Sequence, residues 1–251
     1  MPVSGPAVMF HGAMADLTLD ILPQPDDTTC GPTCLQAVYG FYGDAVDLHR
    51  VIAEVTPLAT GGTLGVFLGI HALHRGYGAT LFTYNLEVFD LTWFDKNPTE
   101  LPGLLMAQAE VKADPKVQLA TAAYLDFLAL GGRIRFQELG PDLIRRHLLD
   151  GRPILTGLSA TYLYGCAREV DVDGRLYYDS VKGDPTGHFV VAHGYDVDTD
   201  SVLVADPLHE NAFRSHNYRV GMLRLLGAVM MGVLTYDGNL LVLEPPPGDA
   251  P

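Results

Sequence analysis

Apolar residues recur at helical spacing near the start of the chain, and the clearest case begins at Cys30. The apolar positions of this segment are Cys34, Leu35, Val38 and Phe41. Their spacing of three or four residues predicts a helix from residue 30 to about residue 41. The polar run 26–29 supplies candidate N-cap side chains, and Pro32 falls in the first turn, where a missing N–H is tolerated.

The same pattern predicts further helices at 48–55, 63–75, 99–112, 115–130, 142–149 and 218–231. Short apolar runs bounded by turn residues predict strands at 79–84, 133–136, 153–158, 187–195, 201–205 and 240–244. Along the chain most of the predicted helices come first, and most of the predicted strands follow in the second half, two of them as a hairpin. This order favours an α+β fold over a doubly wound sheet.

The chain of 251 residues reads as one domain over 1–251. Prolines punctuate two helical stretches within residues 85–131, which we interpret as a helical insertion that could border a binding cleft. Residues 245–251 are rich in proline and are interpreted as a tail. Hydrophobic residues make up 48% of the chain and charged residues 18%, so a core can form and a disordered chain is excluded.

The charge balance excludes several partners. Lys and Arg number 16 against 30 Asp and Glu, a formal net charge of −14, so nucleic acid and anionic membrane surfaces are not expected as partners. No apolar stretch approaches the roughly 18 residues of a membrane span, and residues 1–20 carry no Lys or Arg, unlike a secretory signal. Three cysteines without a signal favour free thiols and a cytoplasmic location.

The sequence places a thiol where it would be reactive. Cys30 begins the first predicted helix, and both the free N–H groups and the dipole of a helix N-terminus favour a thiolate. A thiolate is the nucleophilic form of cysteine. Gln24 lies six residues upstream in a loop bracketed by prolines, and its amide could donate a hydrogen bond to an oxyanion that develops near the thiol.

A histidine and an aspartate mark the two predicted hairpin strands. His188 begins the first strand, and Asp206 follows the second. A carboxylate in this place can accept a ring N–H of the histidine and set its tautomer. Because side chains alternate along strands, the two residues share a face only if the connection within 196–200 has an odd length, such as three residues, or if a bulge shifts the count.

Each of these residues also has an ordinary structural interpretation. Cys30 could be a core thiol, Gln24 a loop residue, and Asp206 the start of a turn before a proline. Cys34 is expected in the core. His71 and His74 have the spacing of metal ligands on a helix, but no carboxylate motif accompanies them, so no metal site is predicted.

Three short motifs together resemble the C39-like peptidase family, a group of papain-like cysteine peptidases. They are Gln24-x-Asp26-x-x-x-Cys30-Gly31-Pro32, Gly187-His188-Phe189-Val190-Val191 and Val204-Ala205-Asp206-Pro207. The resemblance implies that Cys30 is the nucleophile and His188 its base, that Asp206 orients the histidine, and that Gln24 helps to form the oxyanion hole. It also implies a papain-like fold, with a helical part packed on an antiparallel sheet.

The resemblance therefore predicts a cysteine peptidase or amide hydrolase that acts on a peptide or small amide through a thioester acyl-enzyme, without a cofactor. Two alternatives remain open. An acyltransferase would use the same triad with an amine in place of water, and a non-catalytic peptide-binding module would keep the same fold. The more than 150 residues between Cys30 and His188 are many for the family, and the stretch 85–131 accounts for the excess.

Overall fold

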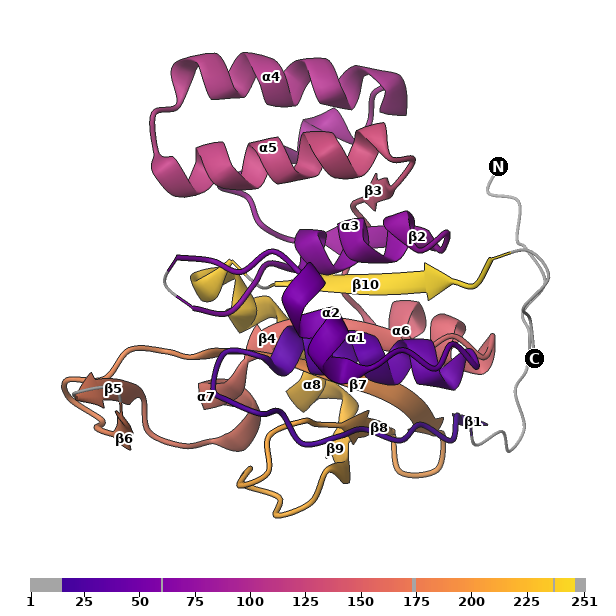
Figure 1. Ribbon diagram of the computed structural model, residues 1–251, viewed down its shortest axis with the longest axis vertical. Coiled ribbons are helices and arrows are strands. Elements are labelled where there is room, and N and C mark those ends of the chain that lie inside the picture. The colour runs from indigo at the N-terminus through magenta and orange to yellow at the C-terminus, as the bar shows by residue number, and fades with distance from the viewer. Residues whose placement is uncertain (1–14, 60, 173–174, 237, 247–251) are drawn as a thin grey trace, which may run out of the picture.

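The fold is a mixed sheet covered by helices on both faces, in a computed structural model that describes residues 15–59, 61–172, 175–236 and 238–246 (Figure 1). The helices are α1 Cys30–Phe41, α2 Leu48–Glu54, α3 Gly65–His74, α4 Leu101–Val111, α5 Pro115–Ala129, α6 Pro141–Leu149, α7 Ala160–Tyr164 and α8 Met222–Met231. Three short 3-10 helices are η1 Leu91–Trp93, η2 Pro98–Glu100 and η3 Gly232–Thr235.

The central sheet has the strand order β3-β2-β10-β4-β7-β8-β9, and β1 pairs with the far end of β7. Its strands are β1 Ala15–Asp16, β2 Gly78–Thr83, β3 Arg133–Arg135, β4 Ile154–Ser159, β7 Gly187–Asp196, β8 Ser201–Ala205, β9 Asn217–Gly221 and β10 Asn239–Glu244. All pairs are antiparallel except β2 with β3. The predicted α+β class, with helices packed on a mostly antiparallel sheet, is confirmed.

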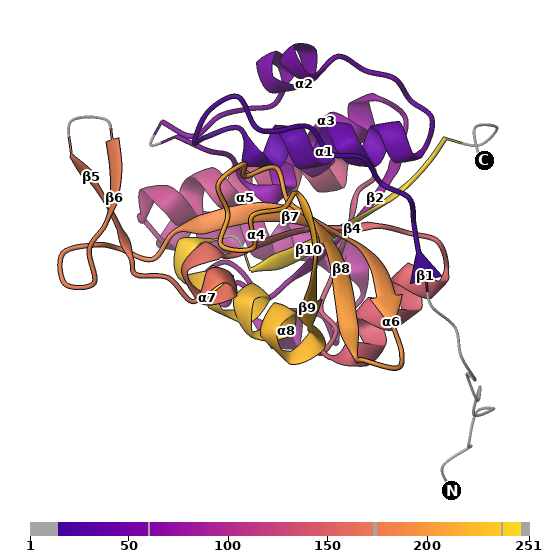
Figure 2. The ribbon, with the colours of Figure 1, turned by 90° about the horizontal axis from the view of Figure 1, so that it is seen from below.

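Both faces of the sheet are buried, because helices cover each of them (Figure 2). Alternate residues of a strand point to opposite faces. On β7, Phe189 and Val191 pack with the cluster under α1, α3 and α5, whereas Val190 and Ala192 pack with the cluster under α6 and α8. Strands that are apolar on both sides are the expected consequence of two helical layers.

The stretch 85–131 contains α4 and α5, which run antiparallel and pack beside α3 (Figure 1). Phe127 of α5 is fully buried and fits against two glycines. A Cβ added at Gly69 would lie 2.6 Å from its ring, and one at Gly132 would lie 2.4 Å from it. Gly69 therefore lets α5 approach α3 closely, and Gly132 leaves room for the same ring where the chain turns after α5. Of the predicted tail, residues 247–251 lie outside the described residues.

Two parts of the chain differ from the sequence-based prediction. The predicted helix 218–231 begins only at Met222, and the residues before it form strand β9, in which Tyr218 and Val220 are buried between exposed neighbours. That alternation has the two-residue period of a strand. Between α7 and β7, a small hairpin of β5 Glu169–Val172 and β6 Arg175–Tyr178 forms a separate two-stranded sheet that is absent from the elements predicted above.

Candidate active site

Cys30 is the first residue of α1, and this helix lies against β7. The Cys34 thiol, one turn later, donates a hydrogen bond to the Phe189 carbonyl over 3.2 Å, which fixes the helix on the strand. A Cβ added at Gly31 would lie 2.8 Å from a methyl carbon of Thr63 and 3.2 Å from the Phe189 ring. Glycine at position 31 therefore permits the close approach that brings Cys30 to the start of β7.

The N-terminus of α1 keeps its free backbone donors. The first N–H groups of a helix have no carbonyl partner within the helix. Thr29, the N-cap residue, does not cap them, because its hydroxyl donates to the Asp26 carbonyl over 3.2 Å instead. Pro32 has no N–H. The Cys30 and Gly31 N–H groups are thus free at the first turn of the helix, beside the thiol, where they can stabilise negative charge.

His188 lies near the start of β7, between the thiol and a carboxylate. Its Nε2 is 2.9 Å from Asp206 Oδ1, which leaves Nδ1 as the free ring nitrogen, and the Cys30 thiol lies near enough to the ring to raise its pKa. Burial lowers the pKa of the His188 ring. The Asp206 carboxylate and the Cys30 thiol outweigh that effect and raise the pKa to about 10. The ring is therefore protonated at neutral pH.

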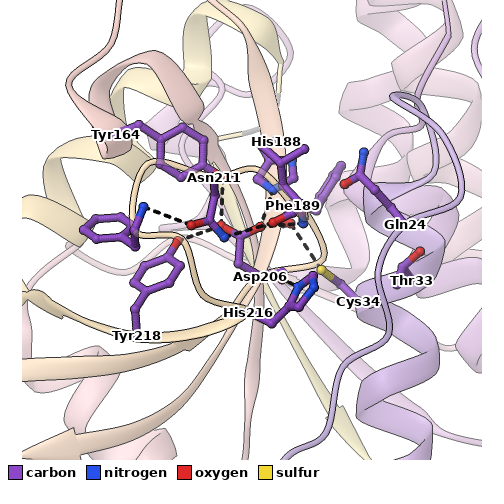
Figure 3. A network of polar contacts seen from close by, with 12 residues as sticks. Gln24, Thr33, Cys34, Tyr164, His188, Phe189, Asp206, Asn211, His216 and Tyr218 are labelled. Carbon is purple, nitrogen blue, oxygen red and sulfur yellow. Dashed lines mark hydrogen bonds and ion pairs between the residues drawn. The ribbon is translucent and has the colours of Figure 1, made fainter.

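Asp206 has no exposed surface, yet its carboxylate is fully paired (Figure 3). Oδ1 accepts from the His188 ring and from the Leu208 backbone N–H over 2.9 Å, and Oδ2 accepts from the hydroxyls of Tyr164 and Tyr218 over 2.7 Å each. Burial raises the pKa of Asp206, but His188 and these donors lower it below its ordinary value overall. A buried charge persists only with such partners, so this carboxylate is built to stay ionised.

A β-bulge brings His188 and Asp206 onto one face. The connection between Asp196 and Ser201 has four residues rather than three, so the strand count alone would turn the two side chains apart. The register shifts between Ala192 and Gly194, where β7 carries one extra residue. Of the two arrangements that the sequence allowed, the structure uses the bulge.

The loop after Asp206 is tied back to the aspartate itself. His216 Nδ1 donates to the Asp206 carbonyl over 2.7 Å, and the Asp206 N–H donates to the His216 carbonyl over 2.8 Å. The Asn211 side chain is buried inside the loop and bonds four backbone groups there, among them the Leu208 and Ser215 carbonyls. These contacts hold Asp206 in place without strand pairing (Figure 3).

Gln24 reaches the same place from the N-terminal segment. Its backbone N–H donates to the Pro207 carbonyl over 2.9 Å, and its Nε2 donates to the Asp26 carbonyl over 2.7 Å. Oε1 is buried without a hydrogen-bond partner and lies on the side of the amide that faces His188 (Figure 3). The structure therefore brings Gln24 to the site, with its amide oxygen rather than its Nε2 turned toward His188.

Two cavities meet beside Cys30 and His188. One, of about 590 Å³, is lined by Cys30 and by loop residues before α1 and α3. The other, of about 530 Å³, is lined by His188, Gln24 and the β5–β6 hairpin. Leu176 of β6 lines both. The lining of these two cavities contains no residue of 85–131, so the expectation that this stretch borders the cleft is not met, and the small hairpin does so instead.

The other sequence candidates lie elsewhere. The His71 ring is buried between the Tyr39 hydroxyl, 2.8 Å from Nδ1, and the Glu54 carboxylate, 3.1 Å from Nε2. Burial lowers its pKa, which suits a neutral ring with a structural role. His74 lines a separate cavity beside α2 and α3. Within the described residues, no group of three His, Cys, Asp or Glu side chains could hold a metal ion.

Sequence reasoning missed the two tyrosines that donate to Asp206. Tyr164 ends α7 and Tyr218 lies in β9, and no local pattern distinguishes either from an ordinary buried tyrosine. Burial, the largest cause, raises the pKa of both hydroxyls, as does the Asp206 charge, so both remain donors. A search for hydroxyl groups near the aspartate would have needed the tertiary fold.

The chain is similar to a known protein family and to several solved structures. The model of the Peptidase_C39 like family matches residues 138–222, a segment that contains His188 and Asp206. The resemblance to C39-like peptidases is confirmed over this segment. A search of the curated proteins finds no match. Within the residues that the structure describes, no helix has the length and apolar character needed to cross a membrane.

Three solved structures are similar to the chain. A double glycine motif protease from an AMS/PCAT transporter, in complex with the leader peptide, shares 12% identity at a TM-score of 0.45, with 92% of this chain and 94% of that one covered. The peptidase domain of Streptococcus ComA, a bi-functional ABC transporter, shares 13% identity at a TM-score of 0.42, with 90% and 97% covered. Xylellain, a cysteine protease from Xylella fastidiosa, shares 14% at 0.44, with 92% and 85% covered.

Proposed function

We propose that the protein is a cysteine peptidase or amide hydrolase in which Cys30 is the nucleophile, His188 the general acid and base, and Asp206 the residue that orients the histidine. One observation carries the proposal. A thiol at a helix N-terminus lies beside a buried ring, and that ring is hydrogen-bonded to a fully paired buried carboxylate. A peptide-binding module would have no need of a buried charge held by four donors.

Acylation begins from a Cys30 thiolate beside a protonated His188 ring. The sulfur attacks the substrate carbonyl carbon, and the C–S bond forms as the carbonyl oxygen takes up negative charge. The free N–H groups at the start of α1 are the donors for that oxyanion, and Gln24 adds its Nε2 when its amide rotates toward the sulfur. The C–N bond then breaks, and His188 gives its proton to the leaving amine.

Deacylation reverses the role of the histidine. The neutral His188 ring takes a proton from water, the resulting hydroxide oxygen attacks the thioester carbonyl, and the C–S bond breaks to release a carboxylic acid and restore the thiolate and the protonated ring. Asp206 stabilises that protonated ring throughout without taking its proton. An amine that replaced water at this step would give acyl transfer with the same residues.

Intact-protein mass spectrometry tests the proposal. With p-nitrophenyl acetate or a peptide ester, the wild-type chain is expected to gain one acyl group on Cys30, and the products show whether water or an added amine removes it. Cys30→Ala should lose the adduct. The matched control Cys166→Ala, which removes a half-buried thiol outside the triad, should keep it. Turnover that persists in Cys30→Ala would contradict the proposal.

A further inference from the structure

The β5–β6 hairpin adds a wall to the proposed active site. It is a two-stranded sheet separate from the central sheet, and it projects from the body just before β7 (Figure 2). Its base is nevertheless fixed, because Glu169 and Asp184 exchange backbone hydrogen bonds of 3.1 Å and 2.8 Å, and the Thr186 hydroxyl donates to the Glu169 carboxylate over 3.0 Å. The wall therefore has a defined position beside His188.

The hairpin presents aromatic rings to the cavity that His188 lines. Tyr177 and Tyr178 are 50% and 61% exposed, and Leu176 beside them is 47% exposed. All three line this cavity. A group of large exposed side chains around one cavity marks a surface that a ligand can cover.

The charge of the same cavity is negative. Among the described side chains, its lining includes the carboxylates of Asp27, Glu169 and Glu210 and no Lys or Arg. The positive charge of the His188 ring is already matched by Asp206. Gln24, from the N-terminal segment, also lines the cavity, and its buried Oε1 has no hydrogen-bond donor. The cavity thus combines acceptors and negative charge with aromatic faces.

We infer that this cavity, which we call the hairpin pocket, binds an Arg or Lys side chain of the substrate next to the scissile bond. This inference rests on the proposed function. The apolar stem of a basic side chain would lie along the rings of Tyr177 and Tyr178, and its charged end would meet the carboxylates. An acidic side chain would be repelled, and a neutral polar one would leave the carboxylates unpaired.

A set of peptides identical except at one position tests the inference. The variable residue is Arg, citrulline, Leu or Glu, placed in separate series directly before and directly after the scissile bond. Citrulline matches Arg in shape and lacks its charge. Wild-type kcat/KM is expected to favour Arg over citrulline by about tenfold in one of the two series, which corresponds to about 1.4 kcal/mol. Higher salt should reduce that preference.

The matching variants remove the charges of the pocket. Glu169→Gln combined with Glu210→Gln should cut the preference for Arg over citrulline to about twofold. Asp142→Asn removes a fully exposed carboxylate of α6 that lines neither cavity, and it should leave the preference unchanged. Equal kcat/KM for the Arg and citrulline peptides in both series, or an unchanged preference in the double variant, would overturn the inference.

A second readout separates this inference from the proposed function. Acylation of Cys30 by p-nitrophenyl acetate does not require the hairpin pocket, because the reagent has no side chain. If Cys30 is acylated and peptides are cut without preference for a basic residue, the pocket assignment is wrong and the peptidase proposal stands. If neither the ester nor any peptide acylates Cys30, the proposed function itself is wrong.

Discussion

The pH dependence of the free energy of unfolding reports how many protons the triad holds in the folded chain. Folding raises the pKa of His188 from its ordinary 6.5 to about 10, because Asp206 and Cys30 outweigh the effect of burial. A group whose pKa is raised on folding contributes stability that is complete below its unfolded pKa and is lost as the pH rises toward its folded pKa. The relevant window therefore runs from pH 6.5 to about pH 10.

The histidine is isolated in Cys30→Ala, which removes the neighbouring thiol. Asp206 still raises the pKa of His188 in this variant, so the free energy of unfolding should fall by up to about 1.2 kcal/mol between pH 7 and pH 8.

Urea unfolding at pH 7.0, 7.5 and 8.0, followed by circular dichroism at constant ionic strength with a reductant, measures this difference. Adding Asp206→Asn to Cys30→Ala should flatten the curve, because burial then lowers the His188 pKa with no carboxylate to oppose it. His71 and His147 have lowered pKa values, so their effect on the free energy of unfolding falls at pH values below this window. Equal slopes for Cys30→Ala with and without Asp206→Asn would refute the raised pKa of His188.

The remaining predictions concern thiol reactivity, the aspartate and the core. Iodoacetamide should alkylate Cys30 first, because burial raises the pKa of both Cys34 and Cys166, and peptide mapping at pH 7 checks the order. Tyr218→Phe should lower the free energy of unfolding by about 1.5–3 kcal/mol, since a hydrogen bond to a buried charge is lost, and urea unfolding measures it. Phe127→Ala should cost about 3–5 kcal/mol by the same assay without changing Cys30 alkylation.

Much of the site could be predicted from the sequence, because its chemistry follows from local patterns. A cysteine that opens an apolar helix, and a histidine and an aspartate at the ends of two apolar strands, can be recognised one segment at a time. Cys30, His188 and Asp206 were found in this way, and the structure brings them together. The predicted strands also largely hold, because each is a short apolar run of the length that a covered sheet requires.

The parts that could not be predicted depend on tertiary contacts. The donors to Asp206 from Tyr164 and Tyr218 come from elements 42 and 12 residues away, and no spacing rule connects them. The β5–β6 hairpin lacks an apolar face packed on a core, so its sequence resembles a loop. The orientation of the Gln24 amide is set by the Asp26 carbonyl, a contact that only the folded loop supplies.

The bulge in β7 restricts how this protein can vary in length. One extra residue between Ala192 and Gly194 is what turns Asp206 toward His188. An insertion or deletion of a single residue anywhere on the path from His188 to Asp206 would reverse the parity and direct the carboxylate to the opposite face of the sheet. A change of two residues in the connection 197–200 would preserve it. Relatives that keep the triad should therefore differ along this path by even numbers of residues.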